Sequence, residues 1–115
     1  MTTSSAFGAG DIVTIEFPKA DGSVGKEDRP CLVVSGPTAL GDYCLAMISG
    51  EKHDDGVSIS GSDLAQGNLS KASFVRVRRL YTLEGTLVTI KRAALKPAAM
   101  VRVMNALCPA LGCKS

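Results

Sequence analysis

The sequence has no tryptophan and few other aromatic residues, with three Phe and two Tyr among its 115 residues. The core is therefore expected to consist mostly of Val, Leu, Ile, Ala and Met. Long apolar runs are also missing, and none approaches the length of a membrane span. The first seven residues, MTTSSAF, contain neither a basic nor an apolar region, so no signal peptide is visible. These absences predict a cytoplasmic protein that does not contact a membrane.

Residues that commonly bind metals are scarce, with one histidine and cysteines at positions 31, 44, 108 and 113. The intervals between the cysteines match no zinc-binding pattern, so neither a metal nor another cofactor is predicted. Cys31 and Cys44 fall in apolar segments, where cysteine behaves as a small hydrophobic residue. Cys108 and Cys113 could be crosslinked outside a reducing compartment, whereas in the cytoplasm all four are expected to be free thiols.

The charge is divided unevenly along what we expect to be a single domain, residues 1–115, with residues 1–9 flexible. Residues 1–70 carry four basic and ten acidic side chains, a net charge of −6. Residues 71–115 carry nine basic side chains and one acidic side chain, a net charge of +8. The basic half indicates a surface that faces a polyanion or an acidic protein, and a solvated basic face is the alternative.

Short segments of alternating polarity, separated by Gly-rich turns, indicate a mainly β protein. Strands are expected at 10–18, 29–36, 43–50, 57–60 and 73–80, with 86–95 as either another strand or a turn. Residues 19–28 and 61–72 are expected to be loops. Five to seven strands without interleaved helices predict a small antiparallel barrel.

The last part of the chain predicts one amphipathic helix. Pro97 suits its first turn, and Gly112 suits its end. An apolar stripe is expected to cover the barrel and consists of Met100, Val103, Met104, Leu107 and Leu111.

Five segments, in this order, carry a family resemblance: GDIVTIEFP, DGSVGKEDRPCLVVS, LAMIS, DLAQGNLSKASFVRVRRLYTL and LKPAAMVRVMNALCPALG. Together they resemble the PemK/MazF family of type II toxins from Gly10 to Gly112. The resemblance implies an SH3-like barrel, a homodimer, and a metal-independent endoribonuclease that inhibits growth. Such an enzyme cuts single-stranded RNA, including mRNA, at a short sequence and leaves 2′,3′-cyclic phosphate and 5′-hydroxyl ends. A cognate antitoxin with an acidic or disordered segment is the implied protein partner.

The resemblance assigns catalytic roles to Arg29 and Ser49. Arg29 matches the family's catalytic arginine, and its planar fork of donors suits a scissile phosphate. The following Pro30 favours an extended backbone at Arg29. Judged without the family, Arg29 would be an edge residue paired with Glu27 or Asp28. Ser49 stands where the family usually has Thr, and its hydroxyl can still donate to a phosphate oxygen.

The sequence offers two candidates for the general base, because the family often has Asp where this chain has Arg78. Glu27, close to Arg29 in sequence, is the first replacement to consider. His53 is the second, although it lies in a predicted turn beside two aspartates and is expected to be solvated.

Basic side chains near these positions are expected to follow the RNA backbone. They are Lys26, Lys71, Arg76, Arg78 and Arg79, of which Arg76 matches a family arginine beside the active groove. Phe74 and Tyr81 either stack on a base or belong to the core.

Two other functions fit the same fold. One is a non-catalytic toxin, similar to the related CcdB group, that binds a protein target such as DNA gyrase. The other is an RNA-binding barrel that does not cleave.

Overall fold

The computed structural model describes residues 7–18, 25–69 and 71–112, which form seven strands, two short 3-10 helices and one α-helix. The strands are β1 (Asp11–Pro18), β2 (Lys26–Ser35), β3 (Asp42–Ser49), β4 (Gly56–Ile59), β5 (Leu64–Gly67), β6 (Ser73–Glu84) and β7 (Val88–Leu95). The helices are η1 (Gly61–Asp63), η2 (Gly85–Leu87) and α1 (Pro97–Ala110).

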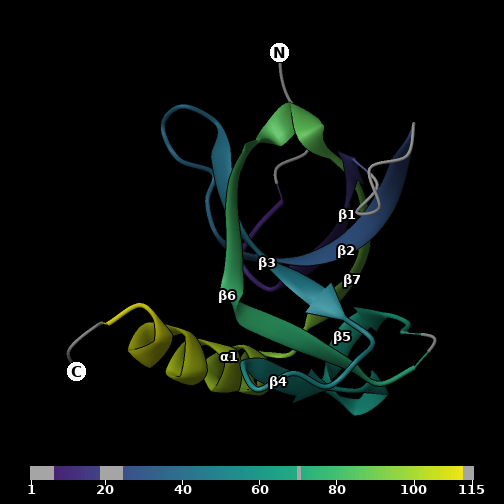
Figure 1. Ribbon diagram of the computed structural model, residues 1–115, viewed down its shortest axis with the longest axis vertical. Coiled ribbons are helices and arrows are strands. Elements are labelled where there is room, and N and C mark those ends of the chain that lie inside the picture. The colour runs from purple at the N-terminus through teal and green to yellow at the C-terminus, as the bar shows by residue number, and fades with distance from the viewer. Residues whose placement is uncertain (1–6, 19–24, 70, 113–115) are drawn as a thin grey trace.

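The strands form one antiparallel sheet in the order β4-β6-β3-β2-β1-β7-β5. Figure 1 shows this sheet curling on itself as a half-barrel, with α1 lying along one side beside β4 and the first half of β6. The prediction of a small, mainly β barrel with a C-terminal helix is therefore confirmed. None of the helices in the described ranges is long and apolar enough to cross a membrane.

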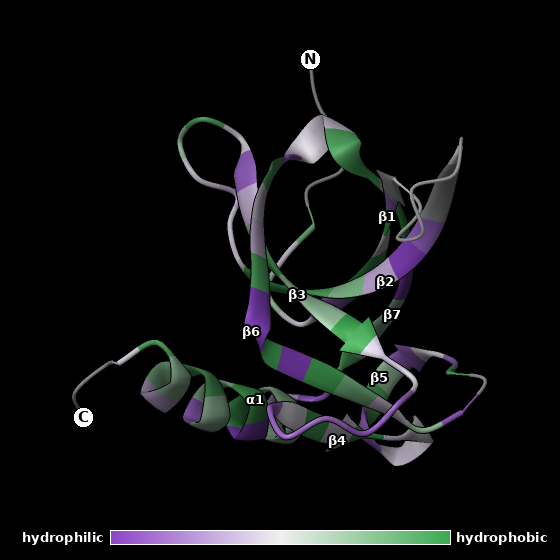
Figure 2. Ribbon diagram, in the orientation of Figure 1, coloured by the Kyte–Doolittle hydropathy of each residue, from purple (hydrophilic) through white to green (hydrophobic). Residues whose placement is uncertain are grey.

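The sheet is buried on both faces where β1 and β2 cross its centre. Ile12 and Leu32 pack in a cluster that α1 covers, whereas Val13 and Val33 pack in a second cluster inside the curl. Side chains of a strand alternate between faces, so adjacent residues serve the two clusters. Figure 2 shows hydrophobic stretches along β3, β6 and α1, which contribute side chains to these clusters.

Strand β6 changes direction in its middle because three residues are inserted in its pairing with β3. Arg76 is opposite Met47, but the next β3 residue, Ala46, is opposite Leu80. The three intervening residues, 77–79, have no residue opposite them on β3, which is the arrangement of a β-bulge. The first half of β6 pairs with β4 as well, and the second half continues around the curl (Figure 1).

Two regions predicted to be loops contain strands. β2 begins at Lys26 rather than at residue 29, and the charged stretch pairs with the outer half of β1. Within residues 61–72, β5 pairs with β7 at a sheet edge, anchored by the buried Leu64. Residues 26–28 are all charged, and three of the four residues of β5 are exposed, so neither segment has the hydrophobic pattern that reveals a strand. The segment 86–95, predicted as a strand or a turn, contains β7.

The helix was predicted correctly, but its buried stripe was partly wrong. Ala99, Val103 and Leu107 are buried, whereas Met104 is 39% exposed and Leu111 is 58% exposed. Ala99 is the residue that the prediction overlooked, because the prediction ranked large side chains above a small one that permits close packing.

The N-terminal residues that are described pack on the curl. The Phe7 N–H donates to the Tyr43 hydroxyl at 3.0 Å, and the two rings meet edge to face. Residues 1–6, most of the stretch predicted to be flexible, lie outside the described residues.

Two leucines allow a matched test of the core. Leu32 is fully buried, whereas Leu40 is 87% exposed in the turn after β2. Leu32→Ala should lower the free energy of unfolding by about 2–5 kcal/mol, since it removes buried methyl groups and leaves a cavity. Leu40→Ala should change it by no more than about 0.5 kcal/mol. Urea unfolding measures both, and equal losses would contradict the assignment of the core.

Candidate active site

Neighbouring strands bring polar side chains together where β3 ends between β2 and β6. Met47 of β3 is opposite Cys31 of β2 on one side and Arg76 of β6 on the other. Arg29 lies two residues before Cys31 and Ser49 lies two residues after Met47, so strand alternation puts both on the face of Met47. Residues from three strands therefore converge although they are far apart in sequence.

These side chains line a cleft of about 440 Å³. Its lining consists of Arg29, Met47, Ile48, Ser49, Gly50, Glu51, His53, Lys71 and Arg76. Four residues predicted to act on RNA, namely two catalytic candidates and two binding candidates, are thus brought to one place.

A second hollow, of about 480 Å³, adjoins the cleft. It is lined by His53, Asp54, Asp55, Arg76 and Arg78. His53 and Arg76 line both hollows, so the two are adjacent, and together they are called the depression. The predicted RNA-binding residue Arg78 lies in its second part.

Arg29 lies at the point where β2 separates from β3. The pairing of these two strands begins at Cys31, so β2 and β3 diverge at Arg29. Its Nη1 donates to Met47 Sδ at 4.0 Å, within the cleft. Burial raises the pKa of the Cys31 thiol to about 12, although the nearby Arg29 guanidinium acts to lower it. Cys31 is therefore a core residue and not a nucleophile.

Ser49 and His53 are in direct contact. Ser49 Oγ lies 3.1 Å from His53 Nε2, and it also accepts a hydrogen bond from the Glu51 N–H at 3.1 Å. His53 is half-buried, so the expectation that it is merely solvated was wrong. The turn after β3 folds back and brings the ring over the end of the strand.

Asp55 fixes the position of Arg76. Its Oδ1 accepts from Arg76 Nε at 3.1 Å and lies 3.1 Å from Nη2, while its Oδ2 accepts the Arg78 N–H at 3.1 Å. The side chains of Asp55 and Arg76 are only 7% and 19% exposed. Burial acts to raise the pKa of Asp55, but the hydrogen bonds from the Arg78 N–H and the Arg76 guanidinium outweigh it and hold the pKa below its usual value.

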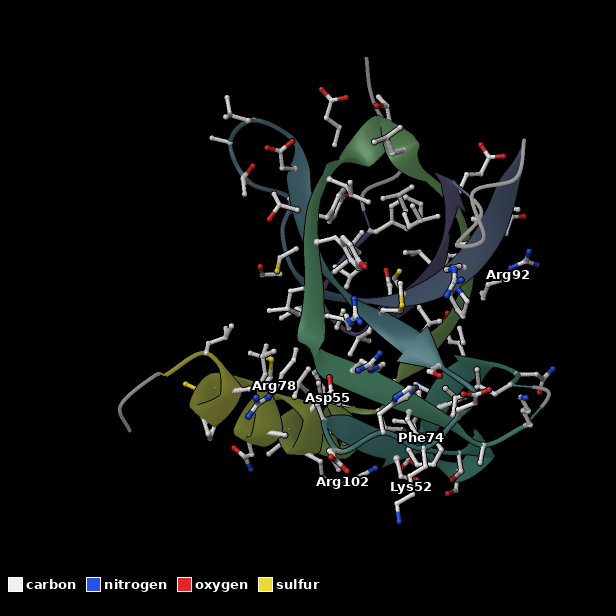
Figure 3. The ribbon with its side chains drawn as sticks, in the orientation of Figure 1. Lys52, Asp55, Phe74, Arg78, Arg92 and Arg102 are labelled. Atoms are coloured by element: carbon white, nitrogen blue, oxygen red, sulfur yellow. The ribbon has the colours of Figure 1, made fainter. Side chains whose placement is uncertain are left out.

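Asp55 also accepts hydrogen bonds from backbone N–H groups of the bulge in β6. Its backbone oxygen accepts the Val77 N–H at 3.2 Å, and its carboxylate takes the next amide, that of Arg78. Figure 3 shows Asp55 and Arg78 near one another, between the bend of β6 and α1. Sequence reasoning missed this role because Asp55 and Arg76 are 21 positions apart, and only the pairing of β4 with β6 brings them together.

The remaining predicted RNA-binding residues differ in placement. Lys71 crosses Gly50 at the cleft, since a Cβ added to Gly50 would lie 2.6 Å from Lys71 Cε. Arg79 is exposed in the bulge and lines neither hollow. The side chains of Lys26 and Glu27 lie outside the described part of the chain, so their roles stay predictions.

The cysteines and the possible metal ligands add little to this site. Cys31 and Cys44 are free thiols, and Cys113 lies outside the described residues. Across the described ranges, no three His, Cys, Asp or Glu side chains gather as a metal site would require.

Asp55→Asn tests the electrostatic role of this carboxylate. Since its pKa is lower in the folded state, ionised Asp55 stabilises that state above its unfolded pKa of about 3.9, and the contribution is lost as the pH falls through the folded pKa. Asp55→Asn should therefore reduce the free energy of unfolding at neutral pH, and its difference from the wild type should shrink below about pH 4. Urea unfolding over a pH series measures this. The exposed neighbour provides the control, Asp54→Asn, which should have little effect, and a difference independent of pH would contradict the expectation.

Comparisons with known proteins agree with this architecture. The chain resembles an endoribonuclease from a mycobacterial species, with a TM-score of 0.74 and 19% identity over 96% of each chain. It also resembles a mycobacterial endoribonuclease in complex with its cognate antitoxin, with a TM-score of 0.73, 20% identity, and coverage of 96% of this chain and 99% of that chain.

MazE-MazF from Deinococcus radiodurans matches with a TM-score of 0.76 and 18% identity, over 96% of this chain and 100% of that chain. At these identities the likeness shows the fold alone. The curated proteins include no match. A family model for the PemK-like, MazF-like toxin of type II toxin-antitoxin systems matches residues 9–111. The chain belongs to this PemK-like, MazF-like toxin family.

Proposed function

We propose that this toxin is an endoribonuclease that cleaves single-stranded RNA, including mRNA, without a metal ion and so inhibits growth. The observation that carries the proposal is the meeting of Arg29, Ser49 and Arg76 in one cleft. The family and the endoribonucleases among the structural neighbours support the same activity. A cytoplasmic location follows from the proposed substrate.

The proposed reaction is attack of the RNA 2′-hydroxyl on the adjacent phosphorus. Negative charge develops on the phosphoryl oxygens in the transition state, and positioned donors stabilise it. Arg29 and Arg76 offer planar donor forks that match phosphate oxygens, and the Ser49 hydroxyl offers a further donor. Asp55 holds Arg76 in place before RNA binds, so little reorganisation is needed.

The RNA backbone would continue along the depression beyond the scissile phosphate. Lys71 at one end and Arg78 at the other supply positive charge for this contact. The exposed Arg79 and the basic Lys26 are proposed to extend it. Glu27 stays a candidate catalytic residue because of its proximity to Arg29 in sequence.

The proposed protein partner is a cognate antitoxin with an acidic or disordered segment. The net charge of +8 over residues 71–115 suits such a segment, because opposite charges attract it to the same surface that would bind RNA. An antitoxin seated there would exclude the substrate.

The alternatives predict different behaviour from the same protein. The comparisons give no support to a toxin that binds a protein target such as DNA gyrase without cleavage. An RNA-binding barrel would hold RNA and leave it intact.

Incubation with a long single-stranded RNA in EDTA tests the activity. The wild type should produce discrete 5′-hydroxyl ends, and Arg29→Ala should lower kcat by about 10²–10³-fold, since it removes a donor to the developing charge. Lys96→Ala removes an exposed positive charge beside the start of α1, outside both hollows, and should cut normally. RNA binding without cleavage would favour the RNA-binding barrel. Growth arrest on expression, with neither RNA binding nor RNA cleavage in the assay, would favour a protein target.

Sedimentation tests the predicted homodimer. Val101 and Met104 are exposed apolar residues on α1, Leu111 is another directly after the helix, and such a surface is suited to an interface. The wild type should sediment as a dimer at micromolar concentration, and Met104→Lys should weaken the association because it places a charge on this face. A strictly monomeric wild type would contradict the prediction.

A further inference from the structure

The depression contains one imidazole, and its placement is well defined. His53 is the sole histidine of the chain. Its backbone oxygen accepts the Gly56 N–H at 3.0 Å, which closes the turn between β3 and β4. Gly56 lies against Phe74 of β6, since an added Cβ would be 3.0 Å from Phe74 Cβ. The turn that carries His53 is thus held closely against the sheet.

The contact with Ser49 leaves Nε2 suited to accept a proton. Ser49 Oγ already accepts the Glu51 N–H, so its own hydrogen is available to His53 Nε2 when the ring proton is on Nδ1. The acceptor nitrogen therefore lies 3.1 Å from a hydroxyl that lines the same cleft as Arg29. A phosphate bound by this hydroxyl would have the adjacent ribose 2′-hydroxyl within reach of the ring.

Asp55, which lines the second hollow together with His53, is less suited to the same task. Both oxygens of Asp55 are used, one by the Arg76 guanidinium and one by the Arg78 N–H. Asp55 thus positions Arg76, while an imidazole can take up and release a proton near neutral pH.

We propose that His53 is the general base of the RNA cleavage reaction. The resemblance would give this role to an Asp at position 78, where this chain has Arg78. This inference rests on the proposed function. On binding, the Ser49 hydroxyl turns to a phosphoryl oxygen, and His53 Nε2 receives the proton of the ribose 2′-hydroxyl. The 2′-oxygen–phosphorus bond forms, the bond from phosphorus to the 5′-oxygen breaks, and the leaving oxygen takes a proton from water. The imidazolium then returns its proton to solvent, so no net proton is consumed.

Charged groups of both signs line the depression with His53. The cations are Arg29, Lys71, Arg76 and Arg78, and the anions are Glu51, Asp54 and Asp55. The pH at which the ring titrates must therefore be measured directly. NMR can do so without ambiguity, because one histidine gives one set of imidazole signals.

The decisive measurements are the kinetics of His53→Ala and His53→Gln on an RNA whose cut site has been mapped with the wild type. We expect both variants to lower kcat by about 10²–10⁴-fold, with KM little changed. Added imidazole should restore part of the activity of His53→Ala, since it can occupy the vacated space. The acidic limb of the wild-type pH profile should coincide with the NMR titration of His53 and should disappear in His53→Gln.

A binding control separates catalysis from folding. Both variants should bind the same RNA, made with a 2′-deoxyribose at the cut site, as tightly as the wild type does. In the wild type, this ligand should shift the His53 NMR signals. Cleavage by His53→Gln at the wild-type rate would overturn the assignment of the base and leave the proposed function intact. Lost activity without imidazole rescue, or an acidic limb retained in His53→Gln, would also overturn it. A wild type that cuts no RNA would overturn both proposals.

Discussion

The candidate site depends on one buried carboxylate, that of Asp55. It binds the guanidinium of Arg76 and, with its own backbone oxygen, takes two successive amides of the bulge in β6. A bulge leaves backbone donors without a strand partner, and such donors are costly when they are buried. Asp55 therefore makes the bend of β6 stable and, through the same contacts, orients an arginine toward the cleft.

The depression combines fixed positive charge with a group that can change its charge. Arg29 and Arg76 are permanently protonated and suited to a phosphate, whereas His53 can carry a proton in one step and release it in another. The Ser49 hydroxyl contacts the His53 ring, and Ser49 lines the cleft together with both arginines. The side chains proposed for phosphate binding and for proton transfer therefore line the same cleft.

Much of this arrangement could be predicted from the sequence, for identifiable reasons. The alternating polarity of residues 73–80 predicted a strand that the structure contains as the first part of β6. The two catalytic candidates named from the family resemblance, Arg29 and Ser49, line one cleft, and their roles stay predictions. The bulge after Arg76 was not predicted, although the alternating pattern breaks where the two charged residues Arg78 and Arg79 are consecutive. The role of Asp55 was also hidden, since an aspartate in a polar turn looks solvated until its partner 21 positions away is known. Edge strand β5 was missed because exposure removes the hydrophobic pattern by which strands are recognised.

The bulge determines which side chains of β6 can be replaced without disturbing the sheet. Residues 77–79 have no opposite neighbour on β3, so the exposed side chains of Arg78 and Arg79 can be exchanged without altering the register of the sheet. Arg78, the residue at which this chain departs from the family resemblance, lies in this permissive segment. Ligand preference can therefore diverge there through single replacements, while the architecture that supports the chemistry is inherited unchanged.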